Sequence, residues 1–160
     1  MNSPNNLKDT VQTLNADDAL RLRFSRDDWR LFEAYLQPFQ LRAGDVLIRH
    51  LDMDRSLYLL ESGTLQVYVP VSAATAAGGR RPVAILRPGA VVGEPSLFGD
   101  TPRMAQVEAM GAATVWALTR PRFEEMAAVK PELALEFLRA VGAVMAQRMR
   151  ANLERGLPVA

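Results

Sequence analysis

The chain has 160 residues, 49% of them hydrophobic, and a formal net charge of +1 at pH 7. A chain of this size forms one globular domain that buries a core without needing cross-links. Cysteine is absent and His50 is the only histidine, which excludes disulfides, thiol nucleophiles, thiolate zinc sites and multi-histidine metal sites.

The sequence also bears on location and partners. No apolar run reaches the roughly 18 residues that a membrane-spanning helix needs. The N-terminus lacks the basic and then apolar pattern of a secretion signal. The balanced charge offers no broad attraction for nucleic acid. We therefore expect a cytoplasmic protein that associates with neither membranes nor, directly, nucleic acid.

The N-terminal part is predicted to be a polar tail followed by a helical segment. Residues 1–15 are rich in Asn, Ser and Thr and contain few core candidates, so we expect a flexible tail. In residues 16–37, Ser25 and Asp28 form a helix-capping pair. The apolar residues that follow recur at three- and four-residue spacing, which predicts an amphipathic helix ending near Gln37.

Between residues 38 and 119 the apolar spacing changes from the helical period to the two-residue period of strands. About seven or eight short strands fit this region, about 8–12 residues apart and separated by turn residues. This pattern is typical of an antiparallel jelly-roll barrel (a double-stranded β-helix). The predicted fold class is mainly β with flanking helices, one N-terminal and two C-terminal.

Residues 120–156 return to helical spacing. The sequence predicts a short helix from Arg120 to Val129 and a longer one from Pro131 to about Arg155, closed by Gly156. Residues 157–160 are expected to be a tail. The apolar stripe of the longer helix covers the jelly roll, a second copy of the chain in a homodimer, or both, and the sequence leaves these alternatives open.

One segment, GEPSLFGDTPRMAQVEA, combines side chains that suit a phosphorylated sugar. Gly93 permits close backbone approach, and Glu94 supplies an acceptor for a hydroxyl group. A proline next to them starts one helical turn, and we expect the amides of Ser96 and Leu97 to stay unpaired there and to favour an anion. Arg103 is placed to close over the same anion from the opposite side.

This segment resembles the phosphate-binding cassette of the cyclic nucleotide-binding domain family, the module of cAMP receptor proteins, kinase regulatory subunits and gated channels. The resemblance extends from about Phe24 to Arg150 and includes the strand and turn from Leu57 to Gly63 and the turn from Leu86 to Gly89. The cassette residues that match the family pattern are Gly93, Glu94, Ser96, Leu97, Pro102, Arg103, Ala105 and Val107.

The resemblance implies a role for the matched residues. Glu94 would accept the ribose 2′-hydroxyl, and Gly93 would approach the sugar through its backbone. Arg103 would pair with the phosphate, helped by amides of Ser96 and Met104. The ligand-binding residues expected on this basis are Gly93, Glu94, Ser96, Leu97, Arg103, Met104 and Ala105.

The base is expected to lie against Leu86, Val91 and Val107, under the C-terminal helix. Met104 stands where family members that favour cGMP tend to carry threonine, and methionine offers guanine no hydroxyl. We therefore expect cAMP as the ligand, with cGMP as the alternative. Pro95 departs from the aliphatic residue usual in the family and removes one donor.

The predicted function is a non-enzymatic sensor module that binds a cyclic nucleotide and relays occupancy through its C-terminal helices to a downstream protein that the sequence does not identify. No nucleophile–base pair, metal cluster or paired-carboxylate spacing suggests an enzyme. One alternative is a fragment or truncated relative of a Crp/Fnr-type transcription regulator, whose DNA-reading helices would follow the long helix. The other is an interaction scaffold that kept the fold and lost the ligand.

Overall fold

The computed structural model of the protein describes residues 7–71 and 79–156. Its strands form two four-stranded antiparallel sheets, in the orders β1-β8-β3-β6 and β2-β7-β4-β5. The strands are β1 (Gln37–Leu41), β2 (Val46–Ile48), β3 (Leu57–Ser62), β4 (Leu65–Pro70), β5 (Arg80–Leu86), β6 (Val91–Val92), β7 (Gln106–Ala109) and β8 (Ala113–Leu118). The helices are α1 (Leu7–Thr13), α2 (Arg26–Glu33), the 3₁₀ turn η1 (Glu94–Leu97), α3 (Arg120–Val129) and α4 (Pro131–Glu154).

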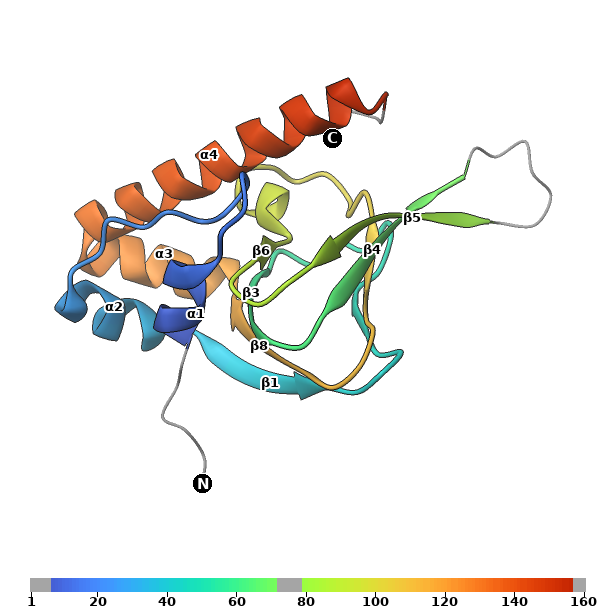
Figure 1. Ribbon diagram of the computed structural model, residues 1–160. Coiled ribbons are helices and arrows are strands. Elements are labelled where there is room, and N and C mark those ends of the chain that lie inside the picture. Colours follow the sequence, from blue (N-terminus) through green and yellow to red (C-terminus); the bar gives the residue numbers. More distant parts are fainter. Residues whose placement is uncertain (1–6, 72–78, 157–160) are drawn as a thin grey trace.

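The two sheets enclose one apolar core. Strands that are neighbours in a sheet are mostly distant in sequence, as in a jelly roll, and they bury Leu60, Leu65, Val107 and Val115 between the sheets. The helices gather at one end of this unit, opposite the protruding β4–β5 hairpin (Figure 1). The predicted fold class, mainly β with flanking helices, is confirmed.

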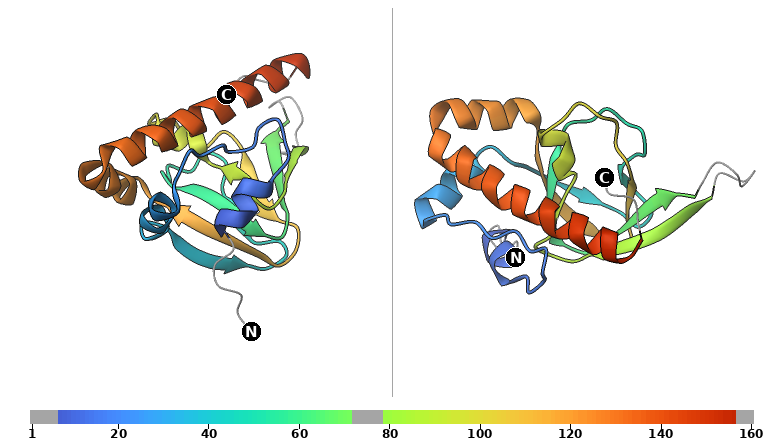
Figure 2. Two further views of the ribbon diagram at one scale, coloured as in Figure 1. Left: turned by 60° about the vertical axis from the view of Figure 1, so that its left-hand side comes forward. Right: turned by 90° about the horizontal axis from the view of Figure 1, so that it is seen from above.

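A second core lies between the helices and strand β3. The strand is buried on both faces, because Tyr58 and Leu60 enter the inter-sheet core while Leu57 and Leu59 face the helical cluster. In that cluster, Phe32 of α2 packs on Phe137 of α4, with ring centroids 5.0 Å apart. Figure 2 shows α2, α3 and α4 as one helical layer against the sheets.

The N-terminal segment corrects one prediction. Residues 7–13 form α1 and bury Leu7 and Val11 in the helical core, so the expectation of a flexible tail across residues 1–15 is wrong for this part. The reason is tertiary: α1 packs against the turn at Gly89, where an added Cβ would lie 2.5 Å from the carbonyl oxygen of Thr10. Residues 1–6 lie outside the described residues.

The predicted cap of α2 is present. The Ser25 hydroxyl accepts a hydrogen bond from the Asp28 amide at 3.1 Å, and the Asp28 carboxylate accepts one from the Ser25 amide at 2.9 Å. The helix ends at Glu33 rather than near Gln37, because Gln37 already belongs to β1 and pairs with Ala117 of β8.

The C-terminal helices carry the chain back across the sheets. The short helix has the predicted bounds, and the longer one ends at Glu154, one residue before the predicted end. From the helical cluster, α4 runs along the sheets toward β5 (Figure 1). The predicted tail, residues 157–160, lies outside the described residues. No helix within the described ranges has the length and apolar character needed to cross a bilayer.

Candidate functional site

A cavity of about 920 Å³ opens between the sheet β2-β7-β4-β5, the segment after β6 and the last turns of α4. It brings together most of the residues singled out in the sequence. Gly93, Glu94, Ser96, Arg103, Met104 and Ala105 line it, and so do Leu86 and Val107. The remaining two predicted residues, Leu97 and Val91, do not line the cavity and pack in the helical core instead.

Gly93 has a backbone conformation and close neighbours that both favour glycine. Its φ angle of +81° lies in the left-handed region, which side chains disfavour. A Cβ at this position would lie 2.7 Å from Nη1 of Arg103 and 3.0 Å from the carbonyl oxygen of Ser56. The glycine therefore lets the arginine side chain pass directly against the cassette backbone.

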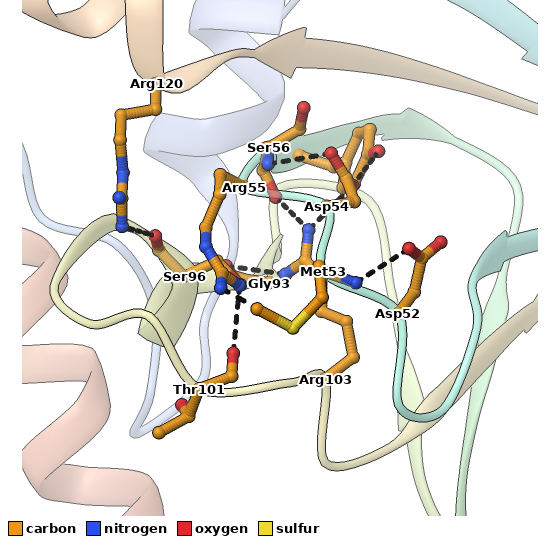
Figure 3. A network of polar contacts seen from close by, with 11 residues as sticks. Asp52, Met53, Asp54, Arg55, Ser56, Gly93, Ser96, Thr101, Arg103 and Arg120 are labelled. Atoms are coloured by element: carbon orange, nitrogen blue, oxygen red, sulfur yellow. Dashed lines mark hydrogen bonds and ion pairs between the residues drawn. The ribbon is translucent and has the colours of Figure 1, made fainter.

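The Arg103 guanidinium is buried and held by three acceptors. Nη1 donates to the Gly93 carbonyl at 3.0 Å, and Nη2 donates to Asp54 Oδ2 at 2.9 Å and to the Ser56 carbonyl (Figure 3). Its backbone is fixed as well, because the Arg103 amide donates to the Asp52 carbonyl at 2.8 Å. Nε is buried and has no partner, so the guanidinium retains unused donor capacity.

Asp54 balances this buried charge. Burial raises the pKa of its carboxyl, but hydrogen bonds from the side chains of Arg103, Tyr58 and Ser56 outweigh that effect and hold the pKa below its usual range. The Tyr58 hydroxyl donates to Asp54 Oδ2 at 2.9 Å. Burial, with the adjacent Asp54 charge, raises the pKa of Tyr58 to about 12. At neutral pH the site therefore holds an arginine cation, a carboxylate and a neutral phenol.

The turn η1 differs in one respect from the prediction. Its first residue, Glu94, is buried, and proline follows it in the first turn as expected. The Ser96 amide, predicted to be unpaired, donates to the Gly93 carbonyl at 3.3 Å, because the chain closes a tight 3₁₀-type turn here. That prediction is wrong for Ser96.

Two further arginines hold the loop that follows η1. Arg120, the first residue of α3, donates to the Ser96 carbonyl at 2.7 Å and to the Gly99 carbonyl at 2.9 Å. Arg55 donates to the Thr101 carbonyl at 2.9 Å (Figure 3). These bonds tie the loop before Arg103 to α3 on one side and to the β2–β3 connection on the other.

Sequence reasoning missed Arg148 of α4. Nη1 donates to Glu94 Oε1 at 2.7 Å, Nε to Asp18 Oδ2 at 2.8 Å, and Nη2 to the Val91 carbonyl at 2.8 Å. Burial lowers the pKa of this guanidinium, but the Glu94 and Asp18 carboxylates outweigh burial and raise it. The bond from Arg148 to Glu94 therefore holds α4 against the cassette.

A signal for Arg148 was present in the sequence. The inward face of α4 buries Phe137, Val141 and Val144, and Arg148 continues the same three- and four-residue spacing. A charged residue on a buried helical face requires a buried partner. For Asp18 and Asp54 no comparable pattern exists, because both lie in irregular segments.

Apolar and polar side chains both line the cavity. Leu86 and Val107 are among the apolar ones, while Asn152 of α4 and Arg155, which follows α4, are among the polar ones. Arg155 donates to the Val83 carbonyl of β5 at 2.9 Å, which holds the end of α4 on the sheet. The cavity lining therefore combines the charged groups Arg103, Glu94 and Arg148 with apolar side chains.

Comparisons with known proteins agree with this geometry. The cyclic nucleotide-binding domain model matches residues 38–129. Acetyltransferase Pat of Mycolicibacterium smegmatis is 36% identical over 89 residues, which are 56% of this chain and 25% of that protein. The catabolite activator protein of Thermus thermophilus superposes with a TM-score of 0.70 and 26% identity, over 84% of this chain and 60% of that one. The regulatory domain of PKA from Toxoplasma gondii, co-crystallised with cAMP, gives a TM-score of 0.57 and 28% identity, over 65% of this chain and 38% of that one.

The family model covers more than half of the chain, and the chain belongs to the cyclic nucleotide-binding domain family. The resemblance found in the cassette is thereby confirmed. The family consists of regulatory domains that are generally not enzymes. The chain spans only a quarter of the acetyltransferase and 60% of the Thermus protein.

Proposed function

We propose that this chain is a non-enzymatic sensor that binds a cyclic nucleotide, cAMP in preference to cGMP, and converts occupancy into movement of α4. The observation that carries the proposal is the placement of Glu94 and Arg103 on one cavity of about 920 Å³. That volume lies within the range of small-molecule sites, and an apolar base with a few charged groups is their usual lining.

The charged side chains of the cavity suit a ribose joined to a phosphate. Glu94 is bonded to Arg148 through Oε1 only, so Oε2 can accept the 2′-hydroxyl. Arg103 lines the cavity and supplies a cationic guanidinium for the phosphate. Leu86 and Val107 offer the base an apolar surface, whereas Val91, whose side chain lies in the helical core, does not.

Two observations support cAMP over cGMP. Met104, on the cavity wall next to Arg103, has no hydroxyl with which to bond guanine. The T. gondii regulatory domain, 28% identical to this chain, was crystallised with cAMP. Competition between cAMP and cGMP for a fluorescent cyclic nucleotide tests this preference, and tighter cGMP binding would contradict it.

The relay rests on the position of α4. Its last turns lie on the cavity wall through Arg148, Ala151 and Asn152, so a bound nucleotide touches both the sheet and the helix. A ligand that contacts α4 in one position better than in another shifts the helix toward that position. The proposed sensor acts on a downstream protein whose binding depends on the position of α4.

The decisive test is the affinity of Arg103 variants. In Arg103→Leu the guanidinium is lost, and we expect cAMP affinity to fall about ten- to hundredfold, which corresponds to roughly 1.5–3 kcal/mol for a hydrogen bond to a charged group. Arg103→Lys keeps the charge and loses the fork, so an intermediate loss is expected. Arg42→Leu removes an exposed arginine that does not line the cavity and serves as the control. Isothermal titration that finds equal cAMP affinity in all four proteins contradicts the assignment and favours a scaffold without a ligand.

A homodimer through α4 is part of the same proposal. On the outward face of α4, Leu135 is 70% exposed and Met149 46% exposed, and with Gly142 they recur every seven residues. This spacing is that of two helices that pack along a shared seam. Sedimentation should give a dimer mass, and Leu135→Glu should give a monomer. A monomeric parent protein would contradict pairing.

A further inference from the structure

Three separate parts of the chain meet at the Arg148 guanidinium. Glu94 comes from the cassette, Arg148 from α4, and Asp18 from the connection between α1 and α2. Asp18 also lines the cavity itself. Its side chain is 35% exposed, against 23% for Arg148 and 8% for Glu94, so Asp18 is the most solvent-exposed of the three.

The connection that carries Asp18 is fixed along α4. Its trace climbs to α4 and follows the helix toward α2 (Figure 1). Arg139 of α4 donates to the Arg21 carbonyl at 3.1 Å, and the Arg23 amide donates to Glu136 Oε2 at 3.1 Å. With Leu20 buried in the helical core, Asp18 is presented to Arg148 from an anchored backbone.

The division of donors at Arg148 leaves one oxygen of Glu94 free. Nε is held by Asp18 and Nη2 by the Val91 carbonyl, so only Nη1 reaches Glu94, at Oε1. Guanidinium and carboxylate groups favour a bidentate pair in which both oxygens are bound. Without Asp18 nothing would hold Nε, and the bond from Nη2 to the Val91 carbonyl alone would resist a turn of the guanidinium that binds both oxygens of Glu94.

We infer that Asp18 is a positioning residue of the nucleotide site: by holding Arg148 Nε, it keeps Glu94 Oε2 available to the ribose 2′-hydroxyl. The inference rests on the proposed function and deepens it. It gives the connection between α1 and α2 a role in ligand selection. Glu94 Oε2 is the atom that would distinguish a ribose from a 2′-deoxyribose, and Asp18 keeps it unoccupied.

The test is titration of the whole chain with cAMP and with 2′-deoxy-cAMP, in the parent protein, Asp18→Asn and Asp17→Asn. The parent should prefer cAMP by about ten- to hundredfold, the worth of one hydrogen bond to a charged group. Asp18→Asn should lower cAMP affinity roughly three- to tenfold and leave 2′-deoxy-cAMP affinity within about twofold. Asp17→Asn removes the same charge at the neighbouring exposed position and should change neither affinity.

Each outcome decides a different claim. If Asp18→Asn weakens both nucleotides by one factor, or changes neither, the positioning role is overturned and the proposed function stands. If the parent protein binds neither nucleotide, the proposed function fails and the inference fails with it. Melting curves check that Asp18→Asn is folded. If it is not, Asp18→Ala, which also removes the carboxylate from Nε and keeps Arg148, replaces it and must show the same selective loss of cAMP affinity.

Discussion

At the scale of single residues, the site depends on how buried charges are balanced. The Arg103 side chain is 4% exposed and its carboxylate partner, Asp54, is 36% exposed. A buried cation is costly unless it is paired and hydrogen-bonded. Asp54, Ser56 and Gly93 provide that pairing, so the cassette keeps its arginine in place before any ligand arrives.

The first residue-scale prediction concerns Asp54→Asn. The variant leaves Arg103 without its anionic partner and should lower the free energy of unfolding by about 1–2 kcal/mol. This value is at the low end of the cost of an unpaired buried charge, because Asp54 is partly solvated. The measurement is urea denaturation at pH 7. Arg30 makes an exposed pair with Asp27, so Asp27→Asn is the control and should change stability little.

The same pair gives a pH dependence. The folded pKa of Asp54 lies below the value of an unfolded aspartate, about 3.9. Its contribution is therefore present above that pH and is lost as pH falls through the folded pKa. The stability difference between the parent and Asp54→Asn should shrink below about pH 4. A difference that stays constant down to pH 2 would show that the ion pair contributes nothing.

Tyr58 gives a second pH dependence, at alkaline pH. Because burial raises its folded pKa to about 12, its contribution is present below the unfolded value of about 10 and is lost as pH rises through 12. The parent protein should lose on the order of 2–3 kcal/mol more than Tyr58→Phe between pH 10 and pH 12. Absorbance at 295 nm should show a phenolate step near pH 12 in the parent that the variant lacks. Ionisation of Tyr58 near pH 10 would contradict this account.

At the scale of elements, tight turns fix how the strands approach one another. Gly63 joins β3 to β4 with φ +88°, and Gly44 lies in the turn between β1 and β2 with φ +86°. Both glycines have a left-handed backbone, but they differ in the room available for an added Cβ atom. A Cβ on Gly63 would lie 2.5 Å from the Ala112 carbonyl, whereas a Cβ on Gly44 meets nothing within 4 Å.

This contrast is a matched test. Gly44→Ala carries only the left-handed penalty, about 1–2 kcal/mol. Gly63→Ala adds a backbone clash and should cost about 2–4 kcal/mol. Chemical denaturation of the two variants gives the comparison directly. Equal costs would mean that the close approach at Gly63 relaxes without penalty.

The elements also show what the sequence predicts well. The Ser25 cap, the bounds of α3 and the strand runs depend on neighbours in sequence, so local patterns suffice. Among the site residues, Gly93, Glu94 and Arg103 belong to one short motif, and the structure places all three on the cavity.

The features that were missed depend on contacts between distant segments. α1 is held by packing of Leu7 and Val11 against elements far along the chain. Asp18 pairs with a residue 130 positions away, and Asp54 with one 49 positions away. Neither aspartate stands in a pattern that differs from an ordinary surface loop, so only the folded chain reveals them.

At the scale of the whole molecule, α4 connects the parts. Its first half packs in the helical core through Phe137 and Val141, and its second half reaches the cavity through Arg148 and Asn152. Two of its residues, Glu136 and Arg139, also hold the connection between α1 and α2. Movement of α4 on ligand binding would therefore be felt at the helical core and at the N-terminal connection.

The most direct measurement is a crystal structure of the chain grown with saturating cAMP. We predict the nucleotide in the cavity, with a phosphate oxygen within hydrogen-bond distance of the Arg103 guanidinium and the 2′-hydroxyl on Glu94. A cavity without nucleotide under these conditions, with Arg103 bonded only to Asp54, Ser56 and Gly93, would contradict the account.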